Sequence, residues 1–271
     1  MRLALGVSYL GANYAGLQKI SRGANIAGTL EAALTEVANH PVHLYAAGRT
    51  DRGVHALQQV MHFDTQSARA AYKWCDGANA HLPDDIRLLW IRDVASDFHA
   101  RFSAHSRRYA YLIYNGRDPG AAMHRLCYPH FKPLNAQAMQ QACVNLGGEY
   151  DCVAFTTTGS KSLTNIRHID WIRVYHNSPW LLVDMQANAF VHRMVRMLVA
   201  ELLRIGEELL PTEHLGGLLK SGAQRPHKNV APAKGLYLTS IGYSPSWALP
   251  LKQVEELWPY RLINNPVETH L

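Results

Sequence analysis

Cysteine is scarce in this chain. Among 271 residues it occurs four times, and no two cysteines form a CxxC pair. No pair of histidines accompanies them at the spacing of metal ligands. These shortages argue against a disulfide framework and against a structural zinc site. We therefore expect reduced thiols in the core at Cys75, Cys127, Cys143 and Cys152.

Long hydrophobic runs are also missing. No apolar stretch approaches the roughly 18–20 residues that a membrane helix needs. Residues 1–7 contain one basic side chain and too short an apolar stretch for a signal peptide, so we expect a first β-strand here and a cytoplasmic protein. Hydrophobic residues make up 48% and charged residues 18% of the chain, which is typical of one large folded domain or two smaller ones.

Acidic residues are fewer than basic ones. The chain has 27 Lys and Arg against 21 Asp and Glu, which gives a net charge of +6 with neutral histidines. Such an excess suggests an anionic partner, and nucleic acid is the commonest one. Many enzymes are mildly basic, so the total alone is weak evidence.

The motifs of several large enzyme classes are absent as well. The sequence has no P-loop, no GxGxxG fingerprint, no GxSxG elbow and no HExxH pair. Any enzyme built on this chain must therefore work with acid, base, phenol and guanidinium groups.

The chain does contain a polar loop, residues 46–56, between two runs that alternate like strands. Gly48 and Gly53 bracket one carboxylate, Asp51, and two guanidiniums. Glycine permits unusual turns and the close approach of a ligand. An Asx-type turn with solvated arginines explains these residues as well as a catalytic site does. An aspartate, with a pKa of about 3.9 in water, becomes an effective nucleophile only when it is desolvated, aimed and kept ionised by a cation.

Hydrophobic periodicity predicts two α+β halves, each a mixed, mostly antiparallel sheet with helices on one face. The expected boundaries are 1–103 and 104–245, followed by a tail, 246–271, with few packing signals. We expect a loop over 116–130 and a mobile segment over 221–234. Strands are expected at 1–7, 42–45, 60–64, 86–94, 109–114, 166–174, 180–186 and 236–241. Helices are expected at 28–38, 70–79, 135–146 and 190–210.

Two elements of the second half carry candidate site residues. In the helix expected over 190–210, His192 and Arg193 lie four and three positions before Arg196 and would share a face with it. Spacing alone favours a solvated basic face. The preceding strand is polar at alternate positions, however, which suggests one side of a cleft. Tyr109 lies in a basic strand, and aromatic and cationic surroundings suit a flipped nucleobase. The polar positions of the strand that precedes the helix expected over 190–210 are Asp184, Gln186 and Asn188.

The segment Gly48-Arg49-Thr50-Asp51-Arg52-Gly53-Val54-His55-Ala56 resembles the signature of the tRNA pseudouridine synthase A family. Further family-like blocks follow in the expected order, at 77–83, 98–104, 108–111, 190–196 and 231–238. The resemblance spans nearly the whole chain to about Tyr243, and ordered blocks are far more specific than any single one.

This resemblance implies the pseudouridine synthase fold, with two similar halves joined around a basic RNA-binding cleft. It implies an isomerase that converts uridine to pseudouridine at positions 38–40 of the tRNA anticodon stem-loop, without a metal or organic cofactor and as a homodimer. Asp51 would be the nucleophile, attacking C6 of the base or C1′ of the sugar. Arg49 would help to extrude the uridine. Tyr109 would stack on the base and take the proton from C5, and Arg196 would pair with Asp51.

Flipping a base costs a few kcal/mol, and phosphate contacts must offset that cost. Any single arginine is more often a solvated surface residue than a contact. The candidate RNA-binding residues are Arg101, Arg107, Arg108, Arg117, Arg125, His192 and Arg193, with Lys228 and Lys234.

The chain departs from the family pattern at four positions that bear on RNA binding. Leu10 and Leu17 stand where an acidic residue and a tryptophan are usual, and Met197 and Ala200 replace an asparagine and a glycine. Ile26-Ala27 also replaces a Val-Gln pair. These changes motivate an alternative, an RNA-binding paralogue with weak or no turnover. A carboxylate-dependent hydrolase is a further alternative, but no second carboxylate stands in a comparable loop.

Overall fold

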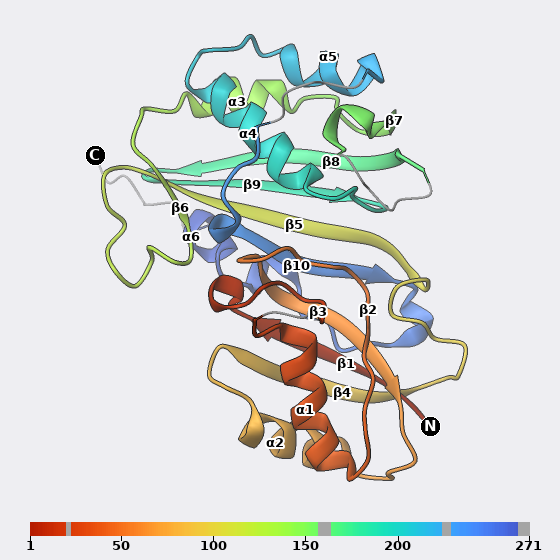
Figure 1. The fold of residues 1–271 in the computed structure, drawn as a ribbon. Coiled ribbons are helices and arrows are strands. Elements are labelled where there is room, and N and C mark those ends of the chain that lie inside the picture. Colours follow the sequence, from red (N-terminus) through yellow and green to blue (C-terminus); the bar gives the residue numbers. More distant parts are fainter. Residues whose placement is uncertain (20–22, 157–163, 224–228, 265–271) are drawn as a thin grey trace. The chain divides into compact units, whose positions relative to one another are not determined.

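The computed structural model describes residues 1–19, 23–156, 164–223 and 229–264 (Figure 1). The chain forms two compact units. Unit 1 comprises Met1–Arg107 and Tyr237–Lys252, and unit 2 comprises Arg108–Leu236 and Gln253–Leu271. Residues 224–228 lie outside the described residues. They belong to the segment expected to be mobile, and they include Lys228. In the part of the chain that is described, no helix is long and apolar enough to cross a membrane.

Unit 1 is built on a sheet in which β1 (Arg2–Tyr9) lies between β4 (Ile86–Val94) and β3 (His55–Asp64), antiparallel to both. The short strand β2 (Tyr45–Ala46) pairs with β3, and β10 (Leu236–Tyr243) pairs with β3 in parallel. β1 carries Gly6 where the indole of Trp90 lies against its backbone, and a Cβ there would lie 2.1 Å from the indole nitrogen.

Two helices cover one face of this sheet, α1 (Ile26–Ala38) and α2 (Ala71–His81) (Figure 1). α1 begins two residues before its expected start because the Asn25 side chain accepts a hydrogen bond of 2.9 Å from the Gly28 amide. It ends at Ala38, and the residue that follows, Asn39, has left-handed backbone angles. Leu30 and Leu34 are fully buried, as the helical spacing predicts.

Unit 2 contains the sheet order β5-β9-β8-β7, with β6 paired in parallel to β5. The strands are β5 (Ala104–Asn115), which begins in unit 1, β6 (Tyr128–His130), β7 (Gly148–Asp151), β8 (Ile166–Asn177) and β9 (Trp180–Ala187). The helices are α3 (Ala136–Ala142), α4 (Met194–Gly206), α5 (His214–Ser221) and α6 (Tyr260–Asn264). Both units are thus α+β with mostly antiparallel pairing, which confirms the predicted fold class.

Several boundaries differ from the prediction. The strand expected over 42–45 is reduced to Tyr45–Ala46, and the loop expected over 116–130 ends in β6. α3 is shorter than 135–146, and α4 shorter than 190–210. α4 starts late because Arg193 adopts left-handed angles, with φ 65°, which no helix interior tolerates. His192 and Arg193 therefore precede the helix, and the prediction that they share a helical face with Arg196 is wrong.

The C-terminal part of the chain packs more than its sequence indicates. Segment 246–271 was expected to be a tail with few packing signals, yet Val254 and Tyr260 are buried in unit 2. The phenol of Tyr260 donates a 2.7 Å hydrogen bond to Asp184. Asp184 itself is fully buried, so the expectation that it lines an open polar face is corrected.

The division into units also differs from the expected boundaries at 103 and 245. The chain returns to unit 1 with Tyr237–Lys252. Two residues near the start of β10, Tyr237 and Leu238, pair with His55 and Ala56 of β3. This pairing joins segments far apart in sequence, and no local pattern encodes it.

The four cysteines are free thiols, as predicted. Three of them are buried, and Cys75 is half-buried. Burial raises the pKa of the Cys127 thiol to about 11 and that of Cys143 to about 12. Thiols with such pKa values are poor nucleophiles at neutral pH.

Candidate active site

The loop that carries Asp51 connects β2 to β3 in unit 1. At its base, the Ala47 amide donates to the Val60 carbonyl at 2.9 Å. The buried side chain of Gln59 then holds Gly48 from both sides, donating to its carbonyl at 2.7 Å and accepting from its amide at 3.3 Å. The Gln59 side-chain amide therefore replaces the next pair of backbone hydrogen bonds between β2 and β3. The loop consequently leaves the sheet from a fixed position at Gly48.

Thr50 is held in the interior of the unit. Its hydroxyl lies 2.8 Å from the phenol oxygen of Tyr9, and its carbonyl accepts a 3.1 Å hydrogen bond from the Leu17 amide. Burial raises the pKa of Tyr9 to about 12, so the phenol stays protonated at neutral pH. With Thr50 fixed on both its side chain and its backbone, the neighbouring Asp51 has little freedom of position.

Asp51 begins a turn that its own carbonyl closes, accepting from the Val54 amide at 3.2 Å. Gly53 lies in this turn with φ 81°, so one of the two bracketing glycines is required by the backbone, as predicted. Asp51 is half-buried, whereas Arg49 and Arg52 on either side of Thr50 and Asp51 are exposed.

The glycine-rich segment after β1 packs directly against this loop. A Cβ at Gly11 would lie 2.0 Å from the Val54 carbonyl oxygen. A Cβ at Gly16, where φ is +117°, would lie 3.0 Å from the Thr50 carbonyl oxygen. The Gly11 amide also donates to Nδ1 of the buried His55 at 3.1 Å, and His55 stacks on Tyr237 at 4.7 Å between ring centroids. Both ends of the Asp51 turn therefore rest on fixed neighbours.

Arg49 has a partner that sequence reasoning missed. With its amide oxygen turned toward the guanidinium, Gln18 accepts hydrogen bonds from Nε at 2.9 Å and from Nη2 at 3.1 Å. Two hydrogen bonds to the same oxygen restrict the position of the guanidinium. Gln18 directly follows Leu17 in the loop after β1, and its neighbours in sequence give no indication that it contacts Arg49.

The other two predicted catalytic residues belong to unit 2. Tyr109, on β5, is half-buried and meets Phe190 edge-on, with 5.3 Å between centroids. Arg196 lies in the first turn of α4 and donates from Nε to the Ala231 carbonyl at 2.7 Å, while the Ala231 amide donates to the Arg196 carbonyl at 3.0 Å. The pairing of Arg196 with Asp51 stays a prediction.

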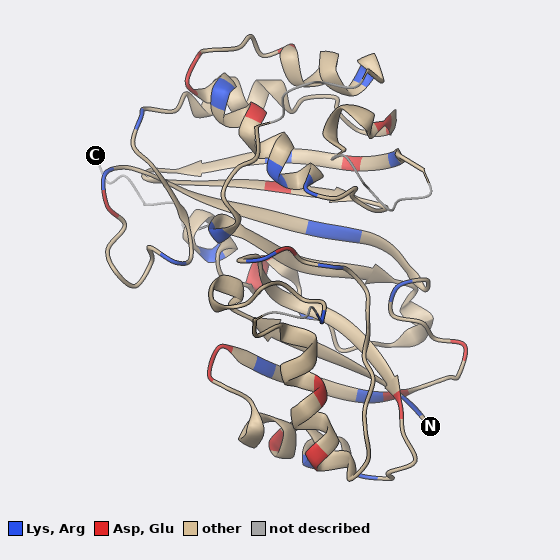
Figure 2. Cartoon of the chain, in the orientation of Figure 1, with Lys and Arg blue, Asp and Glu red and all other residues tan. Residues whose placement is uncertain are grey.

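The candidate RNA-binding residues fall into two groups. Figure 2 shows basic colour on β5, where Arg107 and Arg108 are adjacent. Arg107 donates to the carbonyls of Ala47 at 3.1 Å and Arg101 at 2.9 Å, so it braces unit 1. Of the remaining candidates, those that the structure describes are exposed on the surface, apart from the half-buried Lys234. These exposed residues are Arg101, Arg117, Arg125, His192 and Arg193.

Arg108 is committed to the interior of unit 2. Its Nη2 donates to Asp184 at 2.7 Å, and its guanidinium carbon lies 4.9 Å from the ring of Trp171 and 5.1 Å from that of Tyr260. Burial disfavours the charge, but the hydrogen bonds to Asp184 hold the pKa of Arg108 above its ordinary value. These contacts favour a structural role for Arg108 over a phosphate contact.

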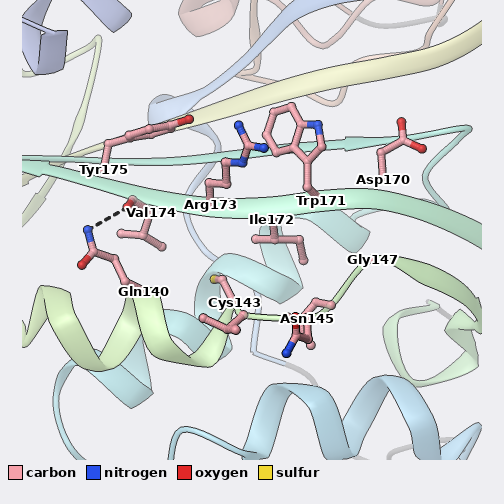
Figure 3. Close-up of a pocket in the computed structure, with 12 residues that line it drawn as sticks. Gln140, Cys143, Asn145, Gly147, Asp170, Trp171, Ile172, Arg173, Val174 and Tyr175 are labelled. Atoms are coloured by element: carbon pink, nitrogen blue, oxygen red, sulfur yellow. Dashed lines mark hydrogen bonds between the residues drawn. The ribbon is translucent and has the colours of Figure 1, made fainter.

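A cavity of about 560 Å³ lies in unit 2 between α3 and β8 (Figure 3). Ile172 and Val174 point toward Cys143 and Gln140 there, and Gln140 donates to the Val174 carbonyl at 3.0 Å. None of the predicted site residues lines this cavity. Across the described ranges, no cluster of three or more His, Cys, Asp or Glu side chains has a geometry that could hold a metal ion.

The Asp51 loop lies within a match to known proteins that covers most of the chain. A family model described as tRNA pseudouridine synthase matches residues 6–103 and 142–244. The chain belongs to this family. It is therefore an isomerase that acts on uridine in tRNA, and the resemblance seen in the sequence is confirmed.

Curated relatives in this family match over most of their length. The tRNA pseudouridine synthase A of Salmonella arizonae is 41% identical over 249 residues, which cover 92% of each chain. That of Haemophilus ducreyi is 41% identical over 250 residues, covering 92% of this chain and 96% of its own. A chain of a solved Cbf5-Nop10-Gar1 complex aligns with 88% of this chain and 49% of its own at 13% identity and a TM-score of 0.36, too low to support a conclusion.

Proposed function

We propose that this protein converts uridine to pseudouridine at positions 38–40 of the tRNA anticodon stem-loop, with Asp51 as the nucleophile. The observation that carries the proposal is the intact Gly48–Ala56 loop, held on Tyr9, Gln59 and Leu17, in a chain 41% identical to tRNA pseudouridine synthase A over 92% of its length. The nucleophile of a base-modifying enzyme must be held in position because small displacements cost much of the rate.

The reaction needs no net addition or loss of atoms. The Asp51 carboxylate adds to the flipped uridine at C6 of the base or at C1′ of the ribose, and the bond between N1 and C1′ breaks. The uracil turns so that C5 bonds to C1′, the Asp51 adduct is released, and the proton on C5 is lost while N1 gains one. Because the product is an isomer of the substrate, the balance requires no oxidant and no hydrolytic water.

Three further side chains have roles in this proposal. Arg49 takes part in extruding the uridine, and its orientation by Gln18 supports a role that depends on geometry. Tyr109 stacks on the base and accepts the C5 proton. Arg196 keeps Asp51 ionised.

RNA binding is assigned to the exposed basic residues, since a cation must reach phosphate to contribute affinity. Lys234 is a weaker candidate, and Arg107 and Arg108 have their guanidiniums engaged within the protein. The residues assigned to RNA binding are Arg101, Arg117, Arg125, His192 and Arg193.

From the family resemblance, the active form is proposed to be a cytoplasmic homodimer.

The test is to incubate the protein with unmodified tRNA transcripts and to map pseudouridine chemically at single-nucleotide resolution. We expect modification at positions 38–40 by the native protein and none by Asp51→Asn, with tRNA binding retained. Asp76→Asn, an exposed carboxylate on α2, is the matched control and should modify normally. Equal activity of native protein and Asp51→Asn would refute the nucleophile assignment. Binding without modification by the native protein would favour the inactive paralogue.

A further inference from the structure

Unit 1 displays an aromatic surface that the proposed chemistry does not use. Phe102 is 75% exposed and Tyr45 is 46% exposed. His99 joins them, with its ring centroid 4.3 Å from that of Phe102 and 5.8 Å from that of Tyr45. The buried ring of His62 lies beneath, 4.6 Å from His99 and stacked on Tyr45 at 5.0 Å. We call Tyr45, His99 and Phe102 the aromatic surface.

The turn that presents this surface is rigid. Nδ1 of His99 accepts from the amides of Arg101 at 3.1 Å and Phe102 at 3.4 Å. His99 and Ser103 also bond to each other, from the His99 amide to Oγ and from the Ser103 amide to the His99 carbonyl, both at 2.9 Å. The exposure of Phe102 is thus a feature of an ordered turn.

The histidine rings of this cluster are neutral at physiological pH. Nδ1 of His62 accepts a 3.1 Å hydrogen bond from the Ala100 amide, so its proton lies on Nε2. Burial lowers the pKa of His62 to about 4, and burial with nearby Arg2 lowers the pKa of His99. Neutral flat rings without net charge are suited to stacking.

A cation accompanies the rings, and the whole surface is tied to the catalytic loop. The guanidinium carbon of Arg101, which is exposed, lies 5.6 Å from the centroid of Phe102. Arg107 donates to the Arg101 carbonyl at 2.9 Å and to the Ala47 carbonyl at 3.1 Å. Ala47 directly precedes the Gly48–Ala56 loop, so one guanidinium links the turn to the segment that carries Asp51.

We propose that the aromatic surface binds an unpaired nucleobase of the tRNA by stacking on Phe102, with Arg101 at the phosphate beside it. This rests on the proposed function, because it assumes that tRNA is the substrate. The rings of Tyr45, His99 and Phe102 form one contiguous group, with Phe102 75% and Tyr45 46% exposed, and contiguous exposed apolar surface marks an interaction site. Aromatic rings beside an arginine are the arrangement that proteins use for unstacked bases. A second copy of the chain is the competing occupant.

The first test measures the dissociation constant of full-length protein for unmodified tRNA at one fixed salt concentration. Phe102→Ala should weaken binding by about 5- to 150-fold, the range that corresponds to the loss of one stacked base. Phe102→Trp keeps a ring and should bind within about twofold of the native protein. Tyr72→Ala removes an aromatic residue that is 63% exposed on α2 of the same unit and should not change binding.

The second test locates the base. Anticodon stem-loop RNAs with 2-aminopurine at single unpaired positions should show fluorescence quenching at one position with native protein, and that quenching should be lost in Phe102→Ala. Loss of affinity in Arg101→Ala but not in Phe102→Ala would mean a backbone contact only and would overturn the stacking proposal. A changed sedimentation coefficient in Phe102→Ala with unchanged RNA affinity would instead assign the surface to self-association.

These outcomes are separate from those that test the proposed function. Pseudouridine formation by the native protein is measured separately, at saturating tRNA. If the native protein modifies tRNA and Phe102→Ala binds as tightly as native, the surface proposal fails and the function stands. If the native protein binds tRNA but forms no pseudouridine, the function fails and the binding measurements still decide the surface.

Discussion

The phenol oxygen of Tyr9 and the hydroxyl oxygen of Thr50 lie 2.8 Å apart in the interior of unit 1. Both side chains are buried, and Thr50 directly precedes Asp51. A buried hydrogen bond from β1, together with the hydrogen bond from the Leu17 amide, therefore fixes Thr50, the residue next to the proposed nucleophile. The amide of Gln59 also contacts the Tyr9 phenol at 3.5 Å while it holds Gly48 at 2.7 Å, so the same cluster anchors two points of the loop.

Tyr9→Phe should lower kcat more than it changes KM. The substitution keeps the ring but leaves the Thr50 hydroxyl without its partner, which costs about 1–3 kcal/mol of stability. A displacement of Asp51 by a fraction of an ångström should reduce kcat by about 10- to 100-fold. Steady-state pseudouridine formation and thermal unfolding measure the two effects. Tyr9→Phe combined with Thr50→Val removes both polar groups and should recover stability without recovering kcat. A full recovery of kcat in the double variant would show that the hydrogen bond does not position the loop.

We expect Gln18 to affect catalysis only through its contact with the Arg49 guanidinium. Gln18→Ala removes the one side-chain oxygen that accepts both hydrogen bonds from the Arg49 guanidinium, so we expect a loss in kcat of about tenfold, with thermal stability unchanged because the contact is exposed. Gln18→Glu retains an acceptor and should keep most of the activity. The informative comparison is in the Arg49→Ala background, where Gln18→Ala should have no further effect. An additive loss in the double variant would contradict the assignment.

The sequence predicted the residues of the Asp51 loop, but it did not predict the side chains that hold this loop in place. Residues 48–56 indicated the loop, its carboxylate and the glycine at 53, because these depend on neighbours in the chain. Tyr9, Gln59 and Gln18 gave no signal, since each reaches the loop across the sheet or from another loop. The start of α4 was misplaced for a related reason. Phe190 and Val191 extend the apolar spacing of the helix, but Arg193 adopts a left-handed conformation that periodicity does not report.

Arg108 should behave as part of the fold. Asp184→Asn leaves the guanidinium of Arg108 buried against a neutral partner, and breaking such a pair typically costs about 3–5 kcal/mol of unfolding free energy. Urea denaturation measures this directly. Asp84→Asn removes the partner of Arg87 in an exposed ion pair and should leave stability unchanged. If Asp184→Asn and Asp84→Asn had equal stability, the structural role of Arg108 would be refuted, and Arg108 would again be a candidate for RNA binding.

The exposed arginines should be separable from Arg108 by salt. Arg117→Ala and Arg125→Ala should each weaken tRNA binding and reduce the magnitude of the slope of log K against log salt by about 1, because each contact made displaces a counterion. Thermal stability should not change, since both residues are exposed. Binding isotherms at several salt concentrations provide the slopes. An unchanged slope would mean that the residue in question is a solvated surface arginine.

Gly16 tests whether the packing of the two loops controls catalysis. A Cβ at this position would lie 3.0 Å from the Thr50 carbonyl oxygen and 3.3 Å from the Arg52 amide nitrogen, on a backbone with φ +117°. Gly16→Ala should therefore cost about 1 kcal/mol or more through the backbone conformation and should also displace the segment that carries Asp51. Gly120→Ala is the matched control, because its φ is +81° but no atom lies within 4 Å of the added Cβ. Both variants should lose stability, but only Gly16→Ala should lose kcat at temperatures where the protein is fully folded. A parallel loss of kcat in both would show that the effect is one of stability alone.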